Sequence, residues 1–132
     1  MRSLAYIAVP SPEHDYPDHP EHAGRVPAIL EALSAAGLLA HLQQLPLTAA
    51  TRDQVQACHH PKYIDALERS MAQAPGYIDY APTYITPQSF DCALNAAGGA
   101  IAAVEAVLSQ HATSALALVR PPGHHAPAQQ AM

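Results

Sequence analysis

Two adjacent histidines near the end of the chain are the residues whose type and placement most clearly suggest chemistry. His124 and His125 follow an apolar run at residues 115–119, and residues 120–123 between them read Arg-Pro-Pro-Gly. Imidazole titrates near neutral pH, so such a pair can accept and donate protons. Because proline fixes φ and glycine permits unusual backbone angles, we predict a sharp, rigid turn presenting both rings. The alternative, which the sequence supports equally, is a surface loop whose two histidines have no catalytic role.

A second group of histidines alternates with acidic residues near the N-terminus: His14, Asp15, Asp18, His19, Glu21 and His22. These residue types can bind a metal, but we favour a polar loop that enters a helix. His59 and His60 form another pair, and because Pro61 follows, we expect His60 to begin a helix. We expect the tyrosines, Tyr84 among them, to serve packing.

The segments that must position these residues alternate between strands and helices. Apolar runs at residues 4–9 and 115–119 predict buried strands, the second typical of a central parallel strand. Apolar spacing over residues 26–36, with Gly37 beyond, predicts an amphipathic helix. Residues 43–47 suggest a short strand, Thr51 a capping box that begins a helix, and residues 74–82 a loop.

The strongest helix signal is the apolar repeat from Phe90 to Leu108. Thr86 is its expected N-cap, and Pro87 its expected first residue. Gly98 and Gly99 lie inside this helix, where each glycine costs about 1 kcal/mol relative to alanine. We therefore predict close packing on two sides. The order of elements favours an α/β layered fold with a parallel sheet.

Composition narrows the class of protein. The 132 residues are 49% hydrophobic and 13% charged, with a net charge of −5. This indicates a globular domain and argues against binding nucleic acid through bulk charge. We expect no membrane span, because the run at residues 115–119 is far too short, and no signal peptide; a cytoplasmic location follows as the default. Cys58 and Cys92 make no disulfide framework, and we expect both in the core.

The segment at residues 120–126, Arg-Pro-Pro-Gly-His-His-Ala, resembles the signature of the zinc-dependent deacetylases, the histone-deacetylase and acetoin-utilisation family. Other segments resemble the family in the same order. They are His19-Pro20-Glu21 with Arg25, His60 with Tyr63, Thr83-Tyr84 with Ser89, and residues 96–100. The chain departs from the family pattern at Gly24-Arg25-Val26, where proline and then Arg-Leu are usual. The resemblance covers essentially the whole chain.

The resemblance implies part of a three-layer α/β/α arginase-deacetylase fold, with residues 1–132 as a single, incomplete domain. It implies hydrolysis of acetyl-lysine or other acetylated amines, with His125 as general base and His124 as electrostatic partner or acid. By the same resemblance, Gly123 contributes to substrate binding and Arg25 lies in the active-site interior. An acid that binds the substrate backbone is expected near Pro82, and Asp79 is the nearest candidate.

The same resemblance places the family's zinc ligands, and a tyrosine that completes the oxyanion site, beyond the tandem histidines. No aspartate or glutamate follows Glu105 in this chain. We therefore expect no metal site and no cofactor in these residues, although the complete family uses zinc, and we expect this polypeptide alone to be inactive.

The alternative is a non-catalytic, shortened relative that acts as an oligomerising or binding module. In either case a parallel sheet that ends at such a strand leaves an open edge. We expect that edge to be covered by a second copy of the chain or by the missing C-terminal part.

Overall fold

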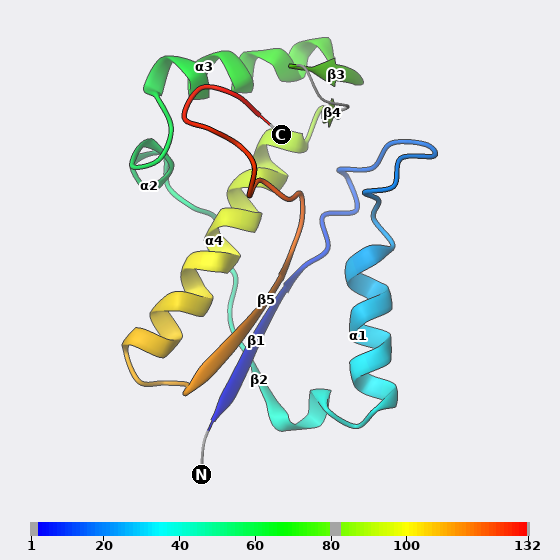
Figure 1. Cartoon of the computed structure of the whole chain (residues 1–132), viewed down its shortest axis with the longest axis vertical. Helices are drawn as coiled ribbons and strands as arrows, with labels where there is room; N and C mark the ends of the chain where they lie inside the picture. The colour runs from blue at the N-terminus through cyan, green and yellow to red at the C-terminus, as the bar shows by residue number, and fades with distance from the viewer. Residues whose placement is uncertain (1–2, 80–82, 132) are drawn as a thin grey trace.

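Three parallel strands form the sheet that carries the histidine turn (Figure 1). The computed structural model describes residues 3–79 and 83–131. Its strands are β1 (Leu4–Val9), β2 (Leu42–Gln44) and β5 (Ser114–Val119), in the order β2-β1-β5. β1 and β5 pair along their whole length, from Leu4 opposite Ser114 to Val9 opposite Val119. The central strand of this sheet is therefore β1, whereas β5, predicted to be central, lies at an edge.

Two helices lie on opposite sides of the sheet, which makes the three layers of the predicted α/β/α arrangement (Figure 1). α1 (Arg25–Ala35) lies on one side, with Val26 buried, and α4 (Ser89–Leu108) packs on β1 and β5 on the other (Figure 1). Gly99 faces the sheet, because a Cβ there would lie 3.0 Å from side-chain atoms of Val9 and Val119. Gly98 faces the backbone around Ala50. The prediction of close packing on two sides of this helix is confirmed.

Two shorter helices follow β2 and frame one end of α4. Between α1 and β2 lies a 3-10 turn, η1 (Leu39–His41). α2 (Arg52–Gln56) begins at the predicted capping box, in which the Thr51 hydroxyl accepts from the Gln54 backbone and the Gln54 side chain accepts from the Thr51 backbone. α3 (Pro61–Ser70) begins at His60, whose ring accepts from the Lys62 N–H, and continues into a 3-10 turn, η2 (Met71–Gln73). The predicted starts of both helices are confirmed.

At several other places the structure differs from what the sequence predicts. Within the segment 74–82 predicted as a loop lies the strand β3 (Gly76–Ile78), which pairs antiparallel with β4 (Thr83–Ile85). β2 lies at residues 42–44, slightly earlier than predicted. Thr86 does not cap α4, because its hydroxyl donates to the Glu13 carbonyl; the N-cap is Gln88. Cys92 is buried as expected, but Cys58 is exposed.

Among the described residues, α4 is long and apolar enough to cross a membrane by length and composition. The expectation that no such segment exists rested on residues 115–119 and does not hold for α4. Core helices of globular proteins meet the same criterion, and α4 packs against the sheet in this fold.

Candidate active site

The centre of the site is the buried side chain of Arg120, the residue that follows β5. Its exposed fraction is 0%. The guanidinium binds the Glu21 carboxylate through two hydrogen bonds, Nε to Oε1 at 2.8 Å and Nη2 to Oε2 at 2.9 Å. It also donates to three backbone carbonyls, those of Pro10, Ser11 and His14, at 2.5–3.0 Å. A fully buried arginine is thus satisfied by one carboxylate and one loop.

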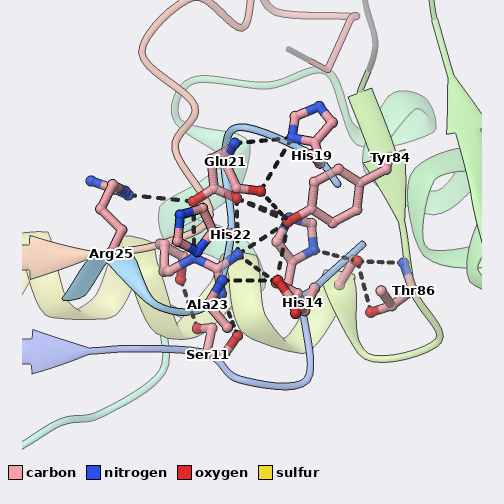
Figure 2. A network of polar contacts seen from close by, with 12 residues as sticks. Ser11, His14, His19, Glu21, His22, Ala23, Arg25, Tyr84 and Thr86 are labelled. Atoms are coloured by element: carbon pink, nitrogen blue, oxygen red, sulfur yellow. Dashed lines mark hydrogen bonds and ion pairs between the residues drawn. The ribbon is translucent and has the colours of Figure 1, made fainter. Parts of the chain in front are cut away.

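Tyr84, on β4, closes the other side of this arrangement. Its hydroxyl donates to Glu21 Oε2 at 2.9 Å and receives a hydrogen bond from Arg120 Nη2 at 3.1 Å. Figure 2 shows Ser11, His14 and Glu21 of the loop between β1 and α1 gathered beside Tyr84. Tyr84 therefore contributes a polar contact as well as the packing that we predicted from the sequence.

Opposing effects set the charge on the Glu21–Arg120 pair. Burial acts to raise the pKa of the Glu21 carboxyl, but hydrogen bonds from Arg120 and Tyr84, together with the arginine charge, outweigh it and lower the pKa below its ordinary value. Burial acts to lower the pKa of Arg120, but Glu21 raises it. Burial and then Glu21 raise the pKa of Tyr84. The pair is therefore ionic, and Tyr84 remains a neutral donor.

His14 is a buried, neutral member of the same cluster. Its Nδ1 lies 2.6 Å from the Ser89 hydroxyl, and its ring stacks on Tyr84 with centroids 4.3 Å apart. Burial, followed by the charge of Arg120, lowers the pKa of His14 from 6.5 to about 4. Because the ring is neutral at pH 7, its approach to Glu21 at 3.9 Å is not an ion pair there.

His124 and His125 lie in the turn that leaves Arg120. Both are exposed, and their ring centroids are 4.1 Å apart with an interplanar angle of 47°. The structure gives no reason for glycine at 123, because its φ is not positive and an added Cβ would meet nothing within 4 Å. The predicted need for a special glycine conformation is therefore wrong.

A cavity of about 1150 Å³ opens beside this turn, between the sheet, α3 and α4. Gly123, His124 and Arg25 line it, together with apolar side chains that include Ile64, Leu67, Phe90, Leu94 and Ile101. On the α3 side, burial and then Asp79 raise the pKa of the Tyr63 hydroxyl to about 12, so it is a neutral donor. The cavity is thus mostly apolar, with a few polar groups at its wall, as small-molecule sites usually are.

The structure places the remaining candidate residues at different positions around the cavity. Arg25 donates to the Val119 carbonyl at 3.2 Å and pairs with Glu21 at 3.5 Å, with its side chain 43% exposed. Asp79, between β3 and β4, accepts from the Ala131 N–H at 2.8 Å and is not part of the cavity wall. Pro82, where the family pattern places an acid, lies outside the described residues.

The other N-terminal histidines, His19 and His22, contact backbone groups of their own loop. His19 Nδ1 contacts the backbone of Glu21, and His22 Nδ1 accepts from the Gly24 N–H. Within residues 3–79 and 83–131 no group of three or more His, Cys, Asp or Glu side chains is placed to hold a metal ion. These contacts, and the start of α1 at Arg25, show that the segment is a polar loop leading into a helix.

Sequence reasoning missed Arg120 and Glu21 as partners. Arg120 was read as part of the signature, and Glu21 as helix entry. One local feature did point to such a pair: Arg120 is a charged residue directly after a buried apolar strand. A charge in that position is expected to have a buried partner. The sequence could not show that this partner is Glu21, because the two residues are 99 positions apart.

Comparison with known proteins agrees with this geometry. The family model described as "Histone deacetylase domain" matches residues 19–132. A "Probable deacetylase" of Methanothermobacter thermautotrophicus is 34% identical over 119 residues, which cover 90% of this chain and 34% of that protein. The polyamine deacetylase HDAC10 of Rattus norvegicus is 34% identical over 106 residues, 76% of this chain and 18% of that protein.

A solved structure, the HDA15 HD domain, shares the fold. It superposes with a TM-score of 0.89 at 27% sequence identity, and the match covers 100% of this chain and 39% of that one. The chain therefore spans about a third of the length of the curated deacetylase from Methanothermobacter. The family match, the relatives and the fold lead to one conclusion: this chain belongs to the histone deacetylase domain family.

Proposed function

We propose that this chain supplies the proton-transfer part of a deacetylase active site, with His125 as general base and His124 as its electrostatic partner or acid. The observation that carries the proposal is the position of the pair. The two rings lie 4.1 Å apart beyond the carboxyl end of β5, where sites of open α/β sheets gather, and His124 lines the cavity. Residue types suited to moving protons thus border a space that can hold a substrate.

The proposed substrate is an acetylated amine, such as acetyl-lysine or an acetylated polyamine. The apolar side chains of α3 and α4 suit the methylene groups of such a molecule. Tyr63 supplies a neutral hydroxyl donor on the same wall. The names of the relatives, a probable deacetylase and a polyamine deacetylase, support this substrate class.

The described residues do not fit the zinc site that the family implies. Catalytic zinc needs three protein ligands and an open position, and residues 3–79 and 83–131 offer no group of three candidate ligands. We therefore assign this chain only substrate contact and proton transfer. We further propose that the 132-residue polypeptide alone does not complete amide hydrolysis.

Binding can be tested separately from turnover. We expect an acetyl-lysine amide, added to the chain, to shift the imidazole NMR resonances of His124 and the methyl resonances of Ile64 and Leu94. Unacetylated lysine amide, whose side chain is a charged ammonium, is the control for the acetyl group, and it should leave these signals unchanged. Identical responses to both ligands, or none to either, would contradict the proposed substrate site.

Turnover is tested with an acetyl-lysine peptide and added zinc. We expect the chain and its His125→Ala variant to give the same background rate. A rate above that of the variant would overturn the proposal of inactivity and would at the same time assign catalysis to His125. The matched control is His111→Ala, which removes a histidine from the opposite end of the sheet.

An alternative function, an oligomerising module, is favoured by one observation. α4 and the edge strand β5 leave an apolar groove of about 430 Å³. Val104, Val107 and Leu108, which line this groove, are 57%, 37% and 78% exposed. Contiguous apolar surface of this kind marks an interaction site.

A further inference from the structure

Arg120 joins β5 to the histidine turn, and both its backbone and its side chain are fixed. Its N–H donates to the Val9 carbonyl at 3.2 Å. Its own carbonyl accepts from the Ser11 hydroxyl at 2.6 Å, in a buried position. The residue therefore continues the pairing of β5 with β1 by one step and is then tied to the loop that follows β1.

The side chain adds contacts to segments that are distant in sequence. The guanidinium reaches the loop between β1 and α1 through three carbonyls and the Glu21 carboxylate, and β4 through Tyr84. A planar group with five donors suits this role, because a lysine could not form the forked pair with Glu21 while reaching the carbonyls. A buried ion pair contributes little net stability relative to apolar packing. Its many fixed contacts favour a geometric role.

The turn beyond Arg120 has few other fixed points. The Ala126 N–H donates to the Gly123 carbonyl at 2.9 Å, which closes the turn on itself. The Ala128 carbonyl accepts from the His60 N–H at 2.9 Å on the far side. His124 and His125 are exposed and contact each other. Their location relative to the sheet is therefore determined mainly by the residue where the turn departs.

We propose that Arg120 is a positioning residue that fixes the turn carrying His124, which borders the cavity, and His125, through its ion pair with Glu21 and its backbone bond with Ser11. The inference rests on the proposed function, in which these two histidines transfer protons. Arg120 does not touch the substrate; it acts through the turn. A loosely held turn would present the same two imidazoles without fixed geometry, and catalytic groups need support of this kind.

The test measures order in the turn by NMR relaxation of the 132-residue chain. Order parameters near 0.85 mark rigid backbone and values below about 0.6 mark flexible backbone. In Arg120→Lys, we expect the amides of residues 123–126 to fall from the rigid toward the flexible range, and the cross-peak between the two imidazole rings to be lost. Arg52→Lys, at an exposed ion pair with Asp65 and Glu68, is the matched control and should change neither.

A second pair of variants separates positioning from general stability. Val26→Ala removes buried atoms from α1 and lowers stability at a side chain that makes none of the hydrogen bonds of Arg120, so it should leave residues 123–126 rigid. Ser11→Ala removes the bond to the Arg120 carbonyl without leaving a buried charge, and it should loosen the turn in a folded protein. If Arg120→Lys does not fold, the order parameters of Ser11→Ala provide the test of the inference.

The inference is overturned if a folded Arg120→Lys, or Ser11→Ala where the first variant is unfolded, keeps the order parameters of the turn. It is also overturned if Val26→Ala loosens the turn equally. None of these readouts involves a substrate. Failure of the proposed function would appear in the binding and turnover assays, whereas failure of this inference would appear only in the order of the turn.

Discussion

At the scale of single residues, the Arg120–Glu21 pair shows how a buried charge is accommodated. Removing both groups from water is costly, and the cost is met only when nearly every donor and acceptor has a partner. The donors of Arg120 bond to Glu21, Tyr84 and three backbone carbonyls. The Glu21 carboxylate also accepts a hydrogen bond from the Tyr84 hydroxyl. Loss of either charged partner would leave the other buried without compensation.

Glu21→Ala is therefore expected to be far more damaging than the same change at a surface ion pair. Leaving Arg120 unpaired should lower the free energy of unfolding by about 3–5 kcal/mol. Glu68→Ala removes a partner of Arg52 whose side chain is 51% exposed, and it should cost less than about 1 kcal/mol. Urea denaturation followed by circular dichroism measures both. Equal losses would show that the buried pair is not the stronger constraint.

His14 should make stability depend on pH. The folded state lowers the pKa of His14 from 6.5 to about 4, so between these values the unfolded chain binds more protons than the folded one. The free energy of unfolding should therefore fall as the pH drops from 6.5 to about 4. His14→Asn, which keeps a polar side chain near Ser89, should reduce this slope. A pH dependence identical in both proteins over that range would refute the assignment.

At the scale of elements, the glycine pair in α4 determines how closely the helix approaches its neighbours. A Cβ at Gly98 would collide with the Thr48 carbonyl and lie 2.8 Å from the Ala50 nitrogen, both backbone atoms. At Gly99 the neighbours are side chains, which can move. The same residue type is thus required for different reasons at the two positions.

Alanine substitutions should separate these reasons. Gly98→Ala should destabilise the protein by about 1–3 kcal/mol or more, because backbone atoms must shift. Gly99→Ala should cost less, since better helix propensity, worth up to about 1 kcal/mol, offsets small side-chain adjustments. Gly123→Ala meets open space and is the control, with little expected change. Thermal unfolding of the three variants ranks them, and a Gly98→Ala protein as stable as the control would exclude the backbone contact.

At the scale of the whole molecule, the apolar groove between α4 and β5 leaves hydrophobic side chains exposed to solvent. β5 is an edge strand, and edges offer unpaired backbone groups to another chain. Exposed leucine and valine side chains lie beside that edge. We propose that a second copy of the chain, or the part of a deacetylase domain absent from these residues, covers this surface.

Self-association through this surface has a direct test. We expect the chain to sediment as a dimer or larger species at micromolar concentration, because burial of the apolar face is favourable. The double variant Val104→Lys with Leu108→Lys, at two exposed residues of the groove, should shift it to monomer. Leu47→Lys, at a leucine that is 44% exposed and is not one of the groove residues, is the control and should not. A parent chain that sediments as a clean monomer would contradict self-association.

The sequence predicted what local pattern encodes. Continuous apolar runs located β1 and β5, and apolar residues at helical spacing located α1 and α4. Capping chemistry located the starts of α2 and α3. These signals depend on neighbours within a few residues. The weaker hairpin of β3 and β4 was missed, since three-residue strands carry almost no periodicity. The start of α4 was misplaced because Thr86 binds Glu13, a contact across 73 positions.

The histidine turn shows the same division. The sequence by itself determined the family and the residues that could move protons, because consecutive residue types such as those at 120–126 are a local property. Only the tertiary structure decided that Arg120 is fully buried, that Glu21 and Tyr84 are its partners, and that His124 borders a cavity while Asp79 binds Ala131. The physical reason is that burial and pairing depend on which distant segments meet, and that meeting is settled by packing the whole chain.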